Sequence, residues 1–325
     1  GDAMTRRAAA LLLLLLAAAF ALSLASPWAD LAAIYGADPA LANALLIELR
    51  LPRAALALTY GAMLGASGAA VQALFANPLA SPDLTGTTSG AALGAVVTAY
   101  LLGFSAPIAL SIGSVAGALG ALLLLLALAG PRAETATLLL SGLAISALAG
   151  ALTTLALALA PSPFAFYDAY DWLMGSLVDR SLVQTAFAAI PAALAFLLLL
   201  RLVRPLDALA LGEEVAQSLG HDILSLRRQV VCLTALGVGA CVAICGAIGF
   251  IGLVAPIFAR RLTGGHPGRA ILPAALIGAI LLLAADLAVR LAPLGRTLPI
   301  GVVTALLGAP FFLWLVAHMR WRLRT

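Results

Sequence analysis

Apolar residues form long uninterrupted runs along the whole chain, and polar residues are confined to the short intervals between them. Each run has at least about 18 residues, enough for an α-helix to cross a hydrocarbon core of about 30 Å. Nine such runs cover residues 8–26, 54–74, 84–103, 107–130, 136–160, 184–203, 229–249, 270–291 and 298–318. The pattern predicts an all-α, polytopic membrane protein in which residues 4–325 form a single transmembrane domain.

Composition and charge support this prediction and orient the chain. Hydrophobic residues make up 63% of the 325 positions and charged residues only 10%. All 18 basic residues other than histidine are arginine, and 13 of them fall in alternate intervals if both termini are cytoplasmic. That bias follows the positive-inside rule. We therefore expect a multi-pass protein of the bacterial inner membrane with both termini in the cytoplasm.

Two termini on one side require an even number of crossings, so a tenth segment is expected. The best candidate is Phe250–Leu262, which is apolar as far as Arg260 and contains Pro256. Such a short segment can cross or re-enter when neighbouring helices shield it. The first run leaves an alternative open, because basic residues ahead of leucines and small residues are also typical of a signal peptide.

An internal repeat is visible when the chain is aligned with itself at an offset of 178 residues. Twelve of the 41 positions from 50 to 90 are then identical, including Gly68 with Gly246 and Pro78 with Pro256. Five predicted crossings separate the copies, so the second copy enters the membrane from the opposite side. Inverted repeats of this kind are typical of transporters.

Several strings are specific enough to indicate a family. They are Arg50-Leu-Pro-Arg53, the stretches 61–72 and 77–86, Ala247–Pro256, Ala285-Asp286 and Leu298–Pro310. Together they resemble the permease family of bacterial ABC importers for iron-siderophores, heme and vitamin B12, and the resemblance covers residues 50–318. One departure is Ile257, where the family usually has histidine. The resemblance implies about ten helices per subunit, a second copy of the chain, two cytoplasmic ATP-binding subunits and a periplasmic substrate-binding protein.

The missing lysine limits the possible energy source. A phosphate-binding P-loop needs a lysine, and this sequence has none. We therefore expect no enzymatic activity from this chain, which leaves a partner subunit or an ion gradient as the energy source, and the resemblance implies that ATP is hydrolysed on the partner subunit. Residues 204–228 form the long hydrophilic interval on the cytoplasmic side. In it, Glu213, Glu214, Ala216 and Gly220 resemble the loop that couples such permeases to their ATPase, and the pattern predicts a short helix from about Glu213 to Gly220.

Three arginines at the outer face suggest a second docking surface. Arg50, Arg53 and Arg290 carry planar guanidinium groups suited to pairing with carboxylates of a binding protein, and the resemblance implies the same role. The alternative for Arg290 is an internal pair with Asp286, four residues earlier on the same helix. Asp286 itself is expected to need a partner, because it lies within an apolar run.

The cargo pathway is expected near an aromatic segment between the fifth and sixth long runs. Tyr167, Tyr170 and Trp172 are suited to passing a flat macrocycle, and Arg180 to meeting its carboxylates, although an interfacial aromatic belt is an equal alternative. The resemblance also implies a cytoplasmic gate at Asn77 and Leu79.

These features favour import of heme by alternating access, with ferric siderophore or cobalamin as the alternative cargo. An ion-coupled secondary transporter is a more distant alternative, because only one acid lies within an apolar run. We expect membrane lipid but no nucleic acid as a partner. No permanently bound cofactor or metal site is predicted: heme is cargo, and ATP belongs to the partner subunit.

Overall fold

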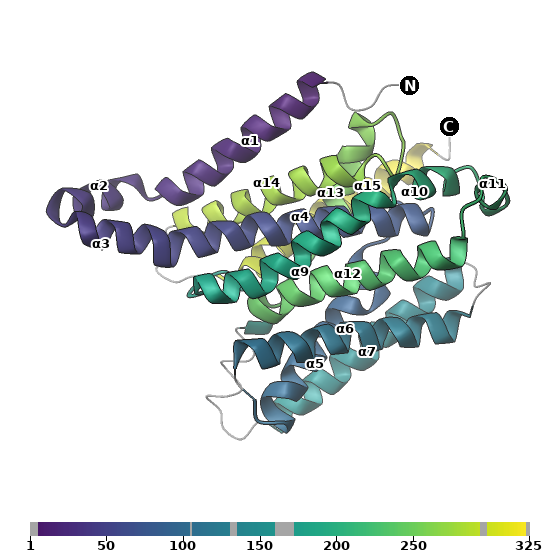
Figure 1. Ribbon diagram of the computed structural model, residues 1–325, viewed down its shortest axis with the longest axis horizontal. Coiled ribbons are helices and arrows are strands. Elements are labelled where there is room, and N and C mark those ends of the chain that lie inside the picture. The colour runs from purple at the N-terminus through teal and green to yellow at the C-terminus, as the bar shows by residue number, and fades with distance from the viewer. Residues whose placement is uncertain (1–5, 105, 131–134, 160–171, 293–297, 323–325) are drawn as a thin grey trace.

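The computed structural model describes residues 6–104, 106–130, 135–159, 172–292 and 298–322, and this part of the chain contains only helices joined by turns and loops. Figure 1 shows them packed side by side as one bundle, with α1 on one side and α7 on the other. The helices are α1 (Arg6–Ala25), α2 (Trp28–Ala37), α3 (Pro39–Ala44), η1 (Leu45–Arg50), α4 (Leu51–Leu74), η2 (Pro82–Thr85), α5 (Thr87–Val96), η3 (Val97–Leu101), α6 (Pro107–Ala129), α7 (Thr135–Ala158), α9 (Leu182–Arg201), α10 (Val203–Leu209), α11 (Glu213–Ser218), α12 (Ile223–Cys245), α13 (Ile251–Leu262), α14 (Ile271–Leu291) and α15 (Ile300–Arg322).

The number of crossing segments agrees with the prediction from hydropathy. In the described part of the chain, seven helices are long and apolar enough to cross a membrane. Two shorter apolar helices, Thr87–Leu101 and Ile300–Phe311, and the predicted short segment α13 bring the total to ten. The all-α fold with about ten transmembrane helices is therefore confirmed. We call the end of the bundle that carries Arg50 the predicted outer end, and the end that carries α11 the predicted cytoplasmic end.

The region between residues 27 and 53 differs from the prediction. The hydropathy pattern predicts no helix between residues 27 and 53, whereas the structure has α2 there and a continuous helix of 36 residues from Pro39 to Leu74. This helix starts cleanly because the Asp38 carboxylate accepts hydrogen bonds from two backbone N–H groups in its first turn and a proline follows directly. At about 1.5 Å per residue it is about 54 Å long. Its first turns therefore extend beyond the ends of α9 and α14, together with α2 (Figure 1).

The core is built around α4, which is buried along most of its length. Small residues allow α14 to pack against it directly. A Cβ atom on Gly61 would lie 2.4 Å from the carbonyl oxygen of Gly278, and one on Gly65 would lie 2.0 Å from that of Ala274. These glycines therefore serve close helix packing, as predicted for small residues in a membrane bundle.

The two halves of the repeat run in opposite directions. Tyr60 on α4 lies beside Gly246, and Met63 lies beside Gly237 of α12, so residue numbers rise along one helix as they fall along the other. The arrangement matches the inverted repeat, although the aligned residues have taken different local roles. Gly68 is inside a helix, whereas Gly246 ends one with a φ of 72°.

The tenth predicted segment is long enough to cross a bilayer if the stretch before its short helix is extended. α13 has 12 residues and rises only about 18 Å. The five residues between it and α12 add up to about 16 Å if extended, giving about 34 Å against a core of about 30 Å. Non-helical backbone at this depth must be satisfied by protein. The buried Tyr60 hydroxyl does so, because it donates to the Gly246 carbonyl at 3.1 Å and accepts from the Ile248 N–H at 3.3 Å.

Candidate functional site

A buried cluster of charged residues joins three helices at the predicted outer end. Asp286 on α14 is 1% exposed, and its Oδ1 accepts a hydrogen bond of 2.8 Å from Nε of Arg53 on α4. Its Oδ2 lies 2.6 Å from Nη2 of Arg290, one turn further along α14. The internal alternative for Arg290 is therefore present in the structure. The second partner, Arg53, is 233 residues away in sequence and could not be found from helical spacing.

Arg290 and its neighbour Arg50 hold the C-terminal end of α1. Arg290 donates from Nη1 to the carbonyl of the buried Ser23 at 2.7 Å and lies 3.2 Å from its hydroxyl, and Arg50 donates to the carbonyl of Leu24 at 2.9 Å. Cationic side chains at the C-terminal end of a helix satisfy its last carbonyls. The small residues that look like the end of a signal peptide are thus part of the folded bundle, as the last turn of α1.

These contacts distinguish three residues that the sequence motif treats alike. The Arg290 side chain is 9% exposed and both of its Nη atoms are used within the chain, whereas the Arg53 side chain is 17% exposed and uses Nε. Arg50 is also partly buried and uses one Nη atom. The side chain of Arg53 is therefore more accessible to solvent than that of Arg290.

The predicted cytoplasmic end presents α11 on the surface. The helix begins at Glu213 and is followed by Gly220 with a φ of 85°, which confirms the predicted short helix. Glu214 is exposed, and so are three large apolar side chains around it, those of Leu211, Val215 and Leu219. Exposed apolar side chains grouped on a short surface helix are typical of a protein-protein contact.

Buried and charged contacts attach α11 to the rest of the bundle. Ala216 is fully buried and packs with Ala208 of α10 and Ile223 of α12. Glu213 forms an ion pair with Arg227 of α12. On α10, the Asp207 carboxylate accepts a 2.8 Å hydrogen bond from the Gly268 N–H, in the turn after α13. Movement of α11 can therefore be transmitted to α12 directly and to α13 through α10. Asp207 and Arg227 were not singled out in the sequence, because neither belongs to the coupling pattern.

The predicted gate residues form a tight turn directly after α4. The Asn77 side-chain oxygen accepts a hydrogen bond from the Leu79 N–H at 2.9 Å, and both residues are half-buried. In the last turn of α4, Gln72 donates from Nε2 to the carbonyl of Leu253 on α13 at 3.3 Å. The gate turn is thus coupled to the short crossing helix.

The predicted pathway residues are only partly described, since Tyr167 and Tyr170 lie outside the described residues. The stretch that starts at Trp172 bridges two helix ends: Ser176 donates its N–H to the last carbonyl of α12, at Cys245, at 2.8 Å, and the Gly175 carbonyl accepts the first N–H of α15 at 3.0 Å. Arg180 follows, half-buried, and its Nε has no hydrogen-bond partner among the described residues. This segment closes the outer ends of α12 and α15, and the structure brings none of its residues together with the gate.

Comparison with known proteins gives consistent relatives. The chain is 44% identical over 274 residues to the vitamin B12 import system permease protein BtuC of Salmonella paratyphi A, an alignment that covers 83% of this chain and 82% of the relative. The protein of the same name from Vibrio cholerae is 40% identical and aligns with 87% of this chain and 86% of its own length.

Solved structures agree with the fold. A structure described as an inward-facing conformation of a metal-chelate type ABC transporter superposes with a TM-score of 0.81 at 32% identity, over 94% of this chain and 97% of that one. PsaBC from Streptococcus pneumoniae superposes with a TM-score of 0.57 at 19% identity, over 81% of this chain and 89% of that one, and shows the fold alone. Residues 9–318 match the sequence family described as the FecCD transport family. The chain therefore belongs to the FecCD transport family.

Proposed function

We propose that this chain is the membrane subunit of an ABC importer that carries cobalamin from the periplasm to the cytoplasm. The observation that carries the proposal is the 44% identity, over 83% of the chain, to a permease named for vitamin B12 import. It favours the alternative cargo of the sequence analysis over heme. The expectation of heme rests on the aromatic segment and Arg180, and Tyr167 and Tyr170 of that segment lie outside the described residues.

The proposed mechanism needs partners at both ends of the bundle. In it, two copies of the chain form a central passage, two ATP-binding subunits dock on α11, and a periplasmic binding protein delivers cobalamin at the predicted outer end. The exposed apolar residues around α11 support the first contact, and the absence of lysine supports a separate source of ATP hydrolysis. The antiparallel halves, α4 and α12, support alternating access by rocking about a central axis.

The decisive experiment is transport by reconstituted vesicles. The chain is assembled with its ATP-binding subunit, the vesicles are loaded with ATP, and binding protein is added outside with cobalamin, heme or a ferric siderophore. We expect ATP-dependent uptake of cobalamin and none of heme. Uptake of heme without cobalamin would overturn the assignment of cargo and leave the family assignment standing.

A variant of Arg180 sharpens the choice of cargo. Heme carries two propionates, each of which would lose a charge-assisted hydrogen bond of about 1.5–3 kcal/mol if it met Arg180 in the passage. Cobalamin has no such pair. We therefore expect Arg180→Ala to leave cobalamin uptake within about twofold of wild type. A tenfold loss of cobalamin uptake, with assembly intact, would contradict this prediction and would show that Arg180 acts on the passage of cobalamin itself.

A further inference from the structure

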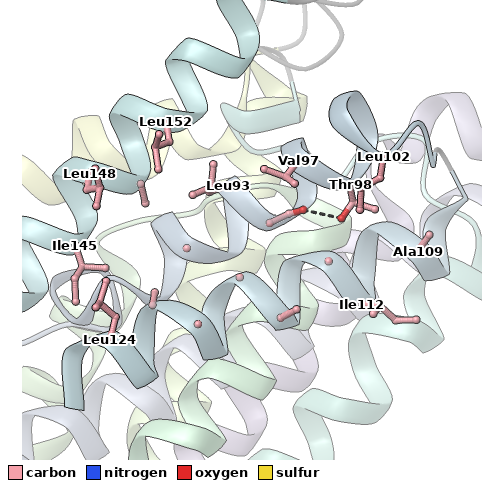
Figure 2. Close-up of a pocket in the computed structure, with 18 of the residues that line it drawn as sticks. Leu93, Val97, Thr98, Leu102, Ala109, Ile112, Leu124, Ile145, Leu148 and Leu152 are labelled. Atoms are coloured by element: carbon pink, nitrogen blue, oxygen red, sulfur yellow. Dashed lines mark hydrogen bonds between the residues drawn. The ribbon is translucent and has the colours of Figure 1, made fainter. Parts of the chain in front are cut away.

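An apolar groove runs along one side of the bundle, between α5 with η3, α6 and α7 (Figure 2). Its volume is about 740 Å³. Along α6 its lining runs from Ala109 to Leu124, and Leu148 and Leu152 of α7 form the opposite wall. Thr98 is the one polar side chain among the lining residues of the described chain, and its hydroxyl donates to the Gly94 carbonyl at 2.8 Å. The groove therefore offers no free polar side chain to a charged or chelated ligand.

Glycines explain why the groove is not filled by the protein itself. A Cβ atom on Gly94 would lie 2.1 Å from the carbonyl oxygen of Gly113, and one on Gly117 would lie 2.1 Å from that of Gly90. α5 and α6 therefore meet backbone to backbone. Because these residues carry no side chains, nothing from this contact reaches across to α7, and the space between the three helices stays open.

The shape of the groove limits what can occupy it. From Ala109 to Leu124 the groove follows α6 for about 22 Å, at about 1.5 Å per residue. Its lining is apolar over this whole length, so a hydrocarbon chain can lie along it.

The surroundings of the groove indicate where such a chain comes from. α6 and α7 are both apolar enough to cross a membrane, and large apolar side chains at the rim are well exposed, with Ile112 at 65% and Leu148 at 54%. The rim is therefore apolar and lies along two helices suited to crossing a membrane, at the level of the lipid tails. Leaving a channel of this size empty would forfeit dispersion contacts along its whole lining. We propose that the groove binds one acyl chain of a membrane phospholipid and keeps it as part of the folded protein.

Gly120 provides a selective way to fill the groove. It lines the groove on α6, and a Cβ atom there would meet no other atom within 4 Å. Gly120→Leu therefore places an apolar side chain in the acyl-chain position without displacing backbone, and helix propensity favours the change. Gly150→Leu on α7 is the matched control, because Gly150 has equally open space and is not among the lining residues.

The test measures phospholipid that remains on the purified protein. Wild type, Gly120→Leu and Gly150→Leu are extracted in detergent, washed identically and weighed by native mass spectrometry, with melting temperatures recorded to confirm folding. We expect one retained phospholipid per chain in wild type and Gly150→Leu, and at least a tenfold lower occupancy in Gly120→Leu. Equal retention by Gly120→Leu, or no retained phospholipid in any of the three, would overturn the proposal.

Other occupants give distinct results in the same preparation. An adduct with the mass of detergent, which shifts when the detergent is changed, would show that any alkyl chain enters and that phospholipid is not retained. Efficient cross-linking between two copies at Gly120→Cys would show that a second copy covers the groove. Either result would overturn the phospholipid assignment.

Discussion

The two ends of the bundle both carry charged residues suited to docking a partner, but they hold them differently. At the predicted outer end, Arg53 and Arg290 converge on Asp286, which is 1% exposed, and part of their hydrogen-bonding capacity is spent inside the chain. At the predicted cytoplasmic end, α11 stands on the surface with Val215 44% exposed and Leu219 61% exposed. A partner proposed to dock at the outer end therefore meets charges that also hold the fold, whereas a partner proposed to dock on α11 meets exposed side chains.

We expect the largest loss of stability from removing the carboxylate of Asp286, which Arg53 and Arg290 share. Asp286→Asn leaves Arg53 and Arg290 buried without their common counter-charge, and breaking a buried ion pair on one side costs about 3–5 kcal/mol. We expect a clear drop in the melting temperature of the purified protein. Glu48→Gln is the control, because Glu48 is exposed at the same end. If both variants melt with wild type, the cluster does not hold the outer end together.

This cluster also shows how far sequence reasoning reaches. Helical spacing identifies the pair of Asp286 and Arg290, because residues four apart lie on one face of a helix. It cannot identify Arg53 or Ser23, which meet them only after α4 and α1 have packed against α14. Hydropathy finds nine of the ten predicted segments, since each is a long apolar run, and the tenth follows from the even number of crossings that two cytoplasmic termini require. It misses α2 and α3, because with 10 and 6 residues they are far shorter than a membrane-crossing helix.

For α11, the sequence predicts the helix but not which of its faces is buried. Its start at Glu213 and its end at Gly220 are local features, so the sequence predicts the helix correctly. The burial of Ala216 and the exposure of Val215 are not local, because they depend on how α11 lies against α10 and α12. The sequence motif names Ala216 but not Val215. In the structure one face of α11 is buried against the bundle and the other is exposed.

The second prediction tests that division within α11. Val215→Asp should leave the melting temperature unchanged, because the side chain is exposed, and should weaken binding of the ATP-binding subunit at least tenfold by placing a charge in an apolar contact. Ala216→Asp should instead lower the melting temperature, since it buries an unpaired carboxylate. The measurements are thermal unfolding and pull-down of the ATP-binding subunit. Equal binding by Val215→Asp and wild type would show that the exposed face is not the docking surface.

A third prediction concerns transmission from α11 to the membrane. Gly220 has a φ of 85° and open space around it, so Gly220→Trp adds a ring at the surface with strain of about 1 kcal/mol. We expect the assembled complex to hydrolyse ATP while transport falls severalfold. The two rates are measured in the same vesicles. Transport that keeps pace with hydrolysis would show that this turn is not needed for coupling.

We expect the smallest effect from substituting Arg53, the more exposed arginine of the outer cluster, and we expect it on the association of the binding protein. The Arg53 side chain is 17% exposed and pairs with Asp286 through Nε, while Arg290 uses both of its Nη atoms on Ser23 and Asp286. A partly exposed charge acts mainly on the rate of association and on its dependence on salt. Arg53→Gln should therefore slow association of the binding protein about threefold to tenfold at low salt, with a difference that shrinks as salt is raised.

Arg290→Gln provides the internal comparison for that measurement. Its guanidinium is 9% exposed and holds the end of α1, so we expect a lower melting temperature and little change in the salt dependence of association. Stopped-flow association of a labelled binding protein, recorded from low to physiological salt, separates the two variants. Parallel salt curves for Arg53→Gln and wild type would remove Arg53 from the docking surface. A flattened curve for Arg290→Gln alone would instead mean that this arginine leaves Asp286 when the binding protein arrives, and that the outer end changes its internal pairing on docking.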